Sequence, residues 1–152
     1  LHLLVVGGSA FAIAPYLERA EALDIDDRVH TAGTTSDIRP YLWVSDVFTF
    51  PTRYETFSLV AYEAAAAELP LVATPVHGIV DIIDDGVNGW LVEHDRDSVA
   101  AALERCLAHR NDLRRMGRAA AARVADFGPE RFDEAWIAFY AEPTAGERSL
   151  SR

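Results

Sequence analysis

The sequence has no lysine, and this absence limits what the protein binds. All 14 basic residues are arginine, against 24 aspartate and glutamate residues, so the net charge is −10. Proteins bind nucleic-acid backbones mainly through an excess of basic residues, so this balance argues against general affinity for nucleic acid. A composition rich in alanine and free of lysine also indicates a GC-rich bacterial genome.

The sequence is equally poor in cysteine, in clustered histidine and in long apolar runs. Cys106 is the single cysteine, which excludes an internal disulfide and fits a reducing compartment. The 5 histidines are scattered singly and lack metal-ligand spacing, so we expect no metal site. The apolar runs fall far short of the roughly 20 residues of a membrane span, and no stretch resembles a signal peptide. We therefore expect a cytoplasmic protein.

What the sequence does contain is an alternation of short apolar runs with helical patterns. We predict strands over residues 3–6, 28–32, 47–50, 71–74 and 90–92. We predict helices over residues 10–23, 36–44 with Ser36 as a cap, 57–68 and 79–83, and then three more, from 95, over 111–125 and over 129–140. Such alternation predicts the α/β class, with a Rossmann-like parallel sheet and helices on both faces.

The length of 152 residues suits one domain. We expect that domain over residues 1–141, followed by a disordered polar tail over 142–152. The chain opens directly on an apolar run at Leu1, without an initiating methionine. This start indicates a fragment of a longer protein.

The ligand-binding loops of such a sheet follow the carboxyl ends of its strands. Four stretches qualify: residues 7–10, 33–37, 51–57 and 75–79. We expect the functional residues to lie there.

Two glutamates stand out near the third of these loops. Glu63 is the one charge in the otherwise apolar helical stretch from Phe57 to Ala67, and no basic residue lies within the helix to pair with it. An unpaired carboxylate costs several kcal/mol if it is buried, so Glu63 needs a polar partner. Glu55 lies just before the same helix, whose free N–H groups and positive dipole end suit a phosphate. Because carboxylates accept hydrogen bonds from paired hydroxyls, we interpret both glutamates as facing a ligand that contains sugar rings.

Six segments in order carry a resemblance to a known family. Glu55 and Glu63, with seven residues between them, lie at the start of the apolar helix. The other segments are Val-Val-Gly-Gly at 5–8, Ala-Gly at 32–33, Leu-Pro-Leu-Val-Ala-Thr at 69–74, His-Gly-Ile at 77–79 and Asp-Gly-Val-Asn-Gly-Trp-Leu-Val at 85–92. From Leu1 to about Tyr140 the chain resembles the C-terminal, donor-binding domain of family 4 retaining glycosyltransferases, which have the GT-B fold.

The resemblance implies a role for each matched position. Glu55 would be the catalytic-site glutamate that contacts hydroxyls of the transferred sugar, and Glu63 would hold the nucleotide ribose. The remaining donor contacts would be the backbone N–H groups of Thr56, Phe57, Ser58 and Leu59 at the diphosphate, Gly33, Thr34 and Thr35 at the base, and the loop of His77, Gly78 and Ile79 beside the donor. The substrate would be a nucleotide diphosphate sugar, with no tightly bound cofactor and no metal.

The sequence also departs from the family. Members often read Glu-Gly-Phe-Gly-Leu where this chain has Thr56 and Ser58 in place of the glycines. The family's basic pair, its first strand and helix, and its N-terminal acceptor domain would precede Leu1, and any membrane contact would be made through that missing half. We therefore expect the fragment alone to be inactive.

The same residues are also consistent with two other functions. One is a nucleotide-sugar epimerase or a phosphorylase of the same fold. The other is a non-catalytic domain that binds nucleotide or docks another protein.

Overall fold

The structure is a computed structural model that describes residues 1–141. The chain forms two compact units, one from Leu1 to Asp46 and one from Val47 onward. The predicted tail over residues 142–152 lies outside the described residues. The expected single domain over residues 1–141 stays a prediction.

The first unit is a parallel strand pair with a covering helix. Strands β1 and β2 pair with Leu3 opposite Val29, and the register shifts after Val5. Positive φ angles at Gly7 and Gly8 turn the chain from β1 into α1, and Ser9 caps this helix by accepting the N–H of Ala12 at 3.3 Å. The elements of this unit are β1 (Leu3–Val6), α1 (Ala10–Ala22), the 3₁₀ helix η1 (Asp26–Arg28), β2 (Val29–Gly33) and α2 (Arg39–Trp43).

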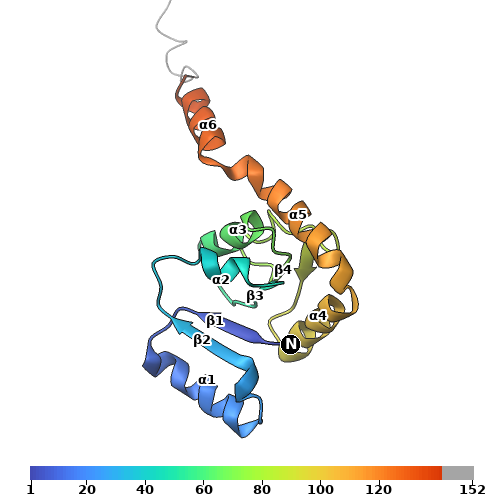
Figure 1. Ribbon diagram of the computed structural model, residues 1–152. Coiled ribbons are helices and arrows are strands. Elements are labelled where there is room, and N and C mark those ends of the chain that lie inside the picture. Colours follow the sequence, from blue (N-terminus) through green and yellow to red (C-terminus); the bar gives the residue numbers. More distant parts are fainter. Residues whose placement is uncertain (142–152) are drawn as a thin grey trace, which may run out of the picture. The chain divides into compact units, whose positions relative to one another are not determined.

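The second unit is built on a three-stranded parallel sheet in the order β3-β4-β5 (Figure 1). The middle strand, β4, pairs through Leu71 with Phe48 on one side and Gly89 on the other. Helices α3 and α4 both contact β4, and α5 packs on α3. The elements are β3 (Phe48–Phe50), α3 (Leu59–Ala66), β4 (Leu71–Ala73), β5 (Gly89–Leu91), α4 (Arg96–Ala108), η2 (Arg110–Asp112), α5 (Leu113–Val124), η3 (Ala125–Phe127) and α6 (Pro129–Ala141).

The core of the second unit lies between this sheet and helices α4 and α5. Its buried members are Val72, Trp90, Val92, Ala102, Cys106, Leu113 and Met116. Burial raises the pKa of the Cys106 thiol, so this cysteine stays protonated and acts as an apolar packing residue. Among the helices of residues 1–141, none combines the length and the apolar character needed to cross a membrane.

The predicted α/β fold with parallel strands is confirmed, and the five strands form two hydrogen-bonded sheets. The helix predicted over 79–83 is wrong, since residues 77–82 form turns. The i→i−4 bonds here, from Val80 to Val76 and from Ile83 to Ile79, are not consecutive. Beyond them, the Asn88 side chain donates to the carbonyl of Ile82 and accepts the N–H of Asp84. These two bonds take backbone groups that a continuing helix would use.

Two helix starts also differ from the prediction. Ser36 caps no helix, because α2 begins only at Arg39, where Pro40 occupies a favoured position in the first turn. The predicted helix over 57–68 is shorter in the structure and begins at Leu59, since Ser58 has a non-helical ψ of 67°. Thr56, Phe57 and Ser58 therefore belong to the loop before α3.

The close crossing of α5 over the end of α3 generates a stability prediction. A Cβ atom at Gly117 would overlap the carbonyl oxygen of Glu68. We expect Gly117→Ala to lower the free energy of unfolding by about 1–3 kcal/mol in urea denaturation, because backbone must move to admit the methyl group. The control Arg118→Ala, at an exposed neighbouring position, should change it by less than about 0.5 kcal/mol. Equal stability of the two variants would contradict this account of the crossing.

Candidate functional site

The loop between β3 and α3 carries Glu55, the first of the two predicted glutamates. Glu55 is partly buried, and its Oε1 lies 3.5 Å from the hydroxyl of Thr52. Within residues 1–141 its carboxylate forms no salt bridge with a basic side chain. The loop thus holds a carboxylate at the carboxyl end of the sheet with most of its acceptor capacity unused.

The N-terminus of α3 presents free backbone donors. The N–H groups of Thr56, Phe57 and Ser58 have no hydrogen-bond partner among the described residues. Ser58 occupies the N-cap position but makes no capping bond, and its hydroxyl, on a residue only 1% exposed, lacks a partner in the described part of the chain. Free N–H groups at the positive end of a helix dipole are suited to binding an anion.

The loop that contains His77 and Gly78 lies against this end of α3. Gly78 has a φ of 82°, and a Cβ placed there would be 3.5 Å from the backbone nitrogen of Ser58. The Tyr62 hydroxyl donates to the carbonyl of Gly78 at 3.2 Å, and the Tyr62 ring stacks on Phe57 at 4.9 Å. The predicted neighbours Phe57, Ser58 and Gly78 are therefore together, and the His77 side chain is exposed.

Glu63 lies about one turn inside α3, on its exposed side. Because the side chain is exposed, the cost that a buried unpaired carboxylate would carry does not arise. The buried positions of α3 are Ala61, Ala64 and Ala65, whereas Leu59 and Glu63 fall on the opposite face because they are four residues apart. Because solvent can hydrate the Glu63 carboxylate, the fold does not require a ligand at this side chain. The carboxylate can accept hydrogen bonds from a ligand.

The predicted residues Gly33, Thr34 and Thr35 belong to the first unit. There the carbonyl of Gly33 accepts the N–H of Gly7 at 2.7 Å, and the Thr34 hydroxyl lies 3.5 Å from the carbonyl of Gly8. These contacts bring the loops after β1 and β2 together at the carboxyl end of that strand pair. Glu55 and Glu63 belong to the second unit.

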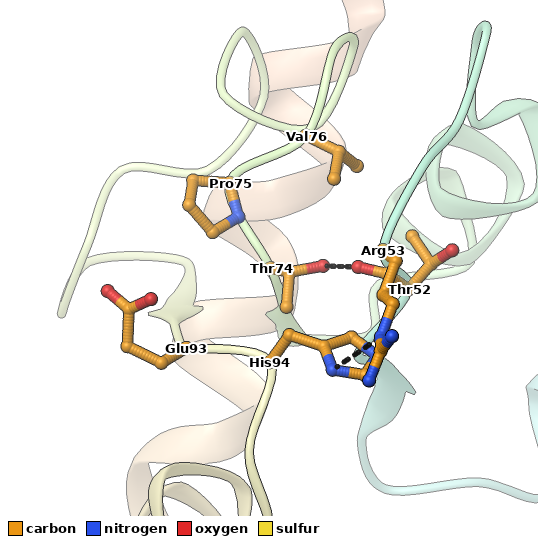
Figure 2. A pocket seen from close by; sticks show the side chains of 7 residues that line it. All are labelled: Thr52, Arg53, Thr74, Pro75, Val76, Glu93 and His94. Carbon is orange, nitrogen blue, oxygen red and sulfur yellow. Dashed lines mark hydrogen bonds between the residues drawn. The ribbon is translucent and has the colours of Figure 1, made fainter.

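An open pocket of about 500 Å³ lies at the carboxyl ends of β3, β4 and β5 (Figure 2). Arg53 Nε donates to His94 Nδ1 at 3.4 Å across this cavity, and the Glu93 carboxylate points away from that pair. The lining residues are Thr52, Arg53, Thr74, Pro75, Val76, Glu93 and His94. Among the residues that the structure describes, no three His, Cys, Asp or Glu side chains gather into a possible metal site.

Sequence reasoning missed Tyr62 and Thr74 as parts of this region, and it did not single out Thr52 within the predicted loop 51–57. The signal for Tyr62 was its place as the one aromatic residue within α3. The signal for Thr74 was a polar residue directly after an apolar strand.

The environment of Tyr62 generates a prediction about pH. Burial, followed by the nearby Asp81 carboxylate, raises the pKa of Tyr62 above its ordinary value of 10.0. The unfolded chain therefore loses this proton first, so the contribution of Tyr62 to stability is complete below pH 10 and falls as the pH rises through the folded pKa.

We expect Tyr62→Phe to lower the free energy of unfolding by about 1 kcal/mol at pH 8, since the bond to Gly78 is lost. This difference from the wild type should shrink when urea denaturation is repeated above pH 10. If the free energies of unfolding of the two proteins changed with pH in parallel, the ionisation of Tyr62 would not be linked to stability.

Comparisons with known proteins show which family the chain belongs to. A family model described as glycosyl transferases group 1 matches residues 1–109. D-inositol 3-phosphate glycosyltransferase of Streptomyces griseus is 34% identical over 155 residues, which are 97% of this chain and 33% of that protein. The protein of the same description from Mycobacterium marinum is 36% identical over 142 residues, 88% of this chain and 30% of that protein. The chain thus spans about a third of the length of these curated relatives.

Solved structures extend the comparison to the fold. Sucrose-phosphate synthase from Thermosynechococcus elongatus superposes with a TM-score of 0.80 at 28% identity, over 92% of this chain and 39% of that one. The Anabaena protein HepE, solved in complex with UDP, gives a TM-score of 0.79 at 22% identity, over 92% of this chain and 40% of that one. The resemblance to GT-B glycosyltransferases is confirmed.

Proposed function

Since the chain belongs to the group 1 glycosyl transferases, we propose that it is the donor-binding part of a retaining enzyme. That enzyme would move a sugar from a nucleotide diphosphate sugar to an acceptor. The observation that carries the proposal is the row of unpartnered N–H groups at the start of α3, with Glu55 before it and Glu63 on the exposed face behind it.

The diphosphate of the donor is proposed to bind at Thr56, Phe57, Ser58 and Leu59. Backbone N–H groups at a helix N-terminus donate to phosphate oxygens and add the favourable dipole end, so this part needs no bound metal. Ser58 has an ordinary negative φ of −88°, so its backbone does not require the glycine often found there in the family. The departure from the family sequence is compatible with diphosphate binding.

The two glutamates are proposed to bind different parts of the donor. Glu55 accepts hydrogen bonds from hydroxyls of the transferred sugar, and Glu63 accepts them from the ribose of the nucleotide. A charged acceptor gives a stronger hydrogen bond than a neutral one, so each contact would contribute both affinity and orientation. Gly33, Thr34 and Thr35 are proposed to border the base, and His77 and Gly78 to lie beside the donor.

UDP is the first nucleotide to test, because HepE, which resembles this chain in fold, was solved with UDP. During transfer the leaving diphosphate gains negative charge, which prearranged N–H donors stabilise. We propose that a longer protein supplies the acceptor-binding domain, and that the 152-residue chain binds nucleotide weakly without turnover.

A titration tests this proposal directly. We expect one of UDP, GDP and ADP to bind the chain in isothermal calorimetry, and Glu63→Ala to weaken its binding about tenfold or more through the lost charged acceptor. Glu104→Ala, which removes an exposed glutamate from α4, is the matched control and should leave the affinity unchanged. Unaltered binding by Glu63→Ala would contradict the ribose contact. No binding of any nucleotide would favour a docking domain.

A further inference from the structure

The loop after β3, which carries Glu55, is tied to the segments that follow β4 and β5 (Figure 2). The Thr74 hydroxyl, directly after β4, donates to the carbonyl of Thr52 at 2.5 Å. Arg53 Nε donates to His94 Nδ1, which follows β5, at 3.4 Å. Because arginine can only donate, Nδ1 of His94 must be the acceptor in this pair. The loop after β3 is thereby fixed from two sides.

The first of these bonds is the stronger constraint. Thr74 is 3% exposed, whereas Arg53 and His94 are both exposed. A buried hydroxyl costs free energy unless it is hydrogen-bonded, and the carbonyl of Thr52 is the partner of Thr74 in the structure. Solvent competes with the Arg53–His94 contact but scarcely with this one.

Thr52 connects this bond to Glu55. Its hydroxyl lies 3.2 Å from the carbonyl of Tyr54 and 3.5 Å from Oε1 of Glu55. Its N–H donates to the carbonyl of Phe50 at 2.9 Å, at the end of β3. The backbone of Thr52 is therefore held by β3 and by Thr74, and its side chain contacts the segment that positions the glutamate.

The sheet itself does not need the Thr74 hydroxyl. β4 pairs with both neighbours through its backbone, and the carbonyl of Ala73 accepts the N–H of Val92 at 3.0 Å. A valine at position 74 would fill a similar space but could not donate to Thr52. The Thr74 hydroxyl therefore stabilises the conformation of the loop after β3 and not the pairing of the sheet.

We propose that Thr74 is a positioning residue for Glu55. Through the carbonyl of Thr52 it holds the loop in the conformation that directs the carboxylate toward the transferred sugar. This inference rests on the proposed function of Glu55. It predicts that loss of the Thr74 hydroxyl weakens binding of the sugar part of the donor and leaves the affinity for the nucleotide unchanged.

The experiment compares wild type, Thr74→Val, Thr74→Ser and Glu55→Gln in the 152-residue chain. Calorimetry with UDP and with UDP-glucose gives the ratio of the two affinities, and amide hydrogen exchange reports on residues 52–57. We expect Thr74→Val to bind UDP with the wild-type affinity. Like Glu55→Gln, it should lose the gain in affinity that the sugar gives UDP-glucose over UDP. Its amides over residues 52–57 should exchange faster than in the wild type. Thr74→Ser, which restores the hydroxyl, should behave as wild type in all three measurements.

The two proposals fail in different ways. If Glu55→Gln loses the gain due to the sugar but Thr74→Val keeps it, the positioning role is overturned and the role of Glu55 stands. If Glu55→Gln keeps the wild-type ratio of the affinities for UDP-glucose and UDP, or if the wild type binds UDP-glucose no more tightly than UDP, the proposed contact of Glu55 with the sugar is overturned. Hydrogen exchange then decides whether Thr74 holds the loop, and unchanged exchange in Thr74→Val overturns that as well.

Discussion

The pairing of β4 with strands on both of its sides is the interaction on which the second unit depends. Its three residues are completely buried, and it is in register with β3 and β5 at each of them. Parallel pairing sends all three strands in one direction, so the loops after Phe50, Ala73 and Leu91 emerge at the same edge. Residues far apart in sequence, such as Arg53 and His94, meet there for this reason.

The same geometry explains how a site arises from an ordinary helix start. α3 returns along the sheet after β3, so its first N–H groups lie at the edge where the loops emerge. Ser58 could have satisfied these donors with its own side chain but makes no capping bond. The donors stay free for an anion, while Tyr62 holds the loop of Gly78 beside them. Structural bonds thus position the loops and, among the described residues, leave the N–H groups of Thr56, Phe57 and Ser58 unpaired, whereas the N–H of Leu59 donates to the carbonyl of Phe57 at 3.1 Å.

Much of this fold could be predicted from the sequence, because short apolar runs bounded by glycine, proline and threonine mark parallel strands well. The position of Glu63 on its helix was predicted from the sequence, but its exposure was not. Composition cannot tell which side of an alanine-rich helix faces the core when almost every residue on it is small and apolar. The helix predicted over 79–83 does not form because its i→i−4 bonds are not consecutive, and Asn88, from outside the segment, bonds the backbone groups of Ile82 and Asp84 that a longer helix would use. The contacts of Thr74 and Tyr62 also join distant segments, and no local pattern encodes them.

The central claim is that the diphosphate of a nucleotide binds at the start of α3, and amide chemical shifts recorded during a UDP titration test it most directly. The account predicts that the largest shift changes fall on Thr56, Phe57, Ser58 and Leu59, because their N–H groups would donate to the phosphate oxygens. Uridine alone, which lacks the phosphates, should leave these four amides nearly unmoved. Saturable binding of UDP with the largest changes elsewhere in the chain would contradict the claim.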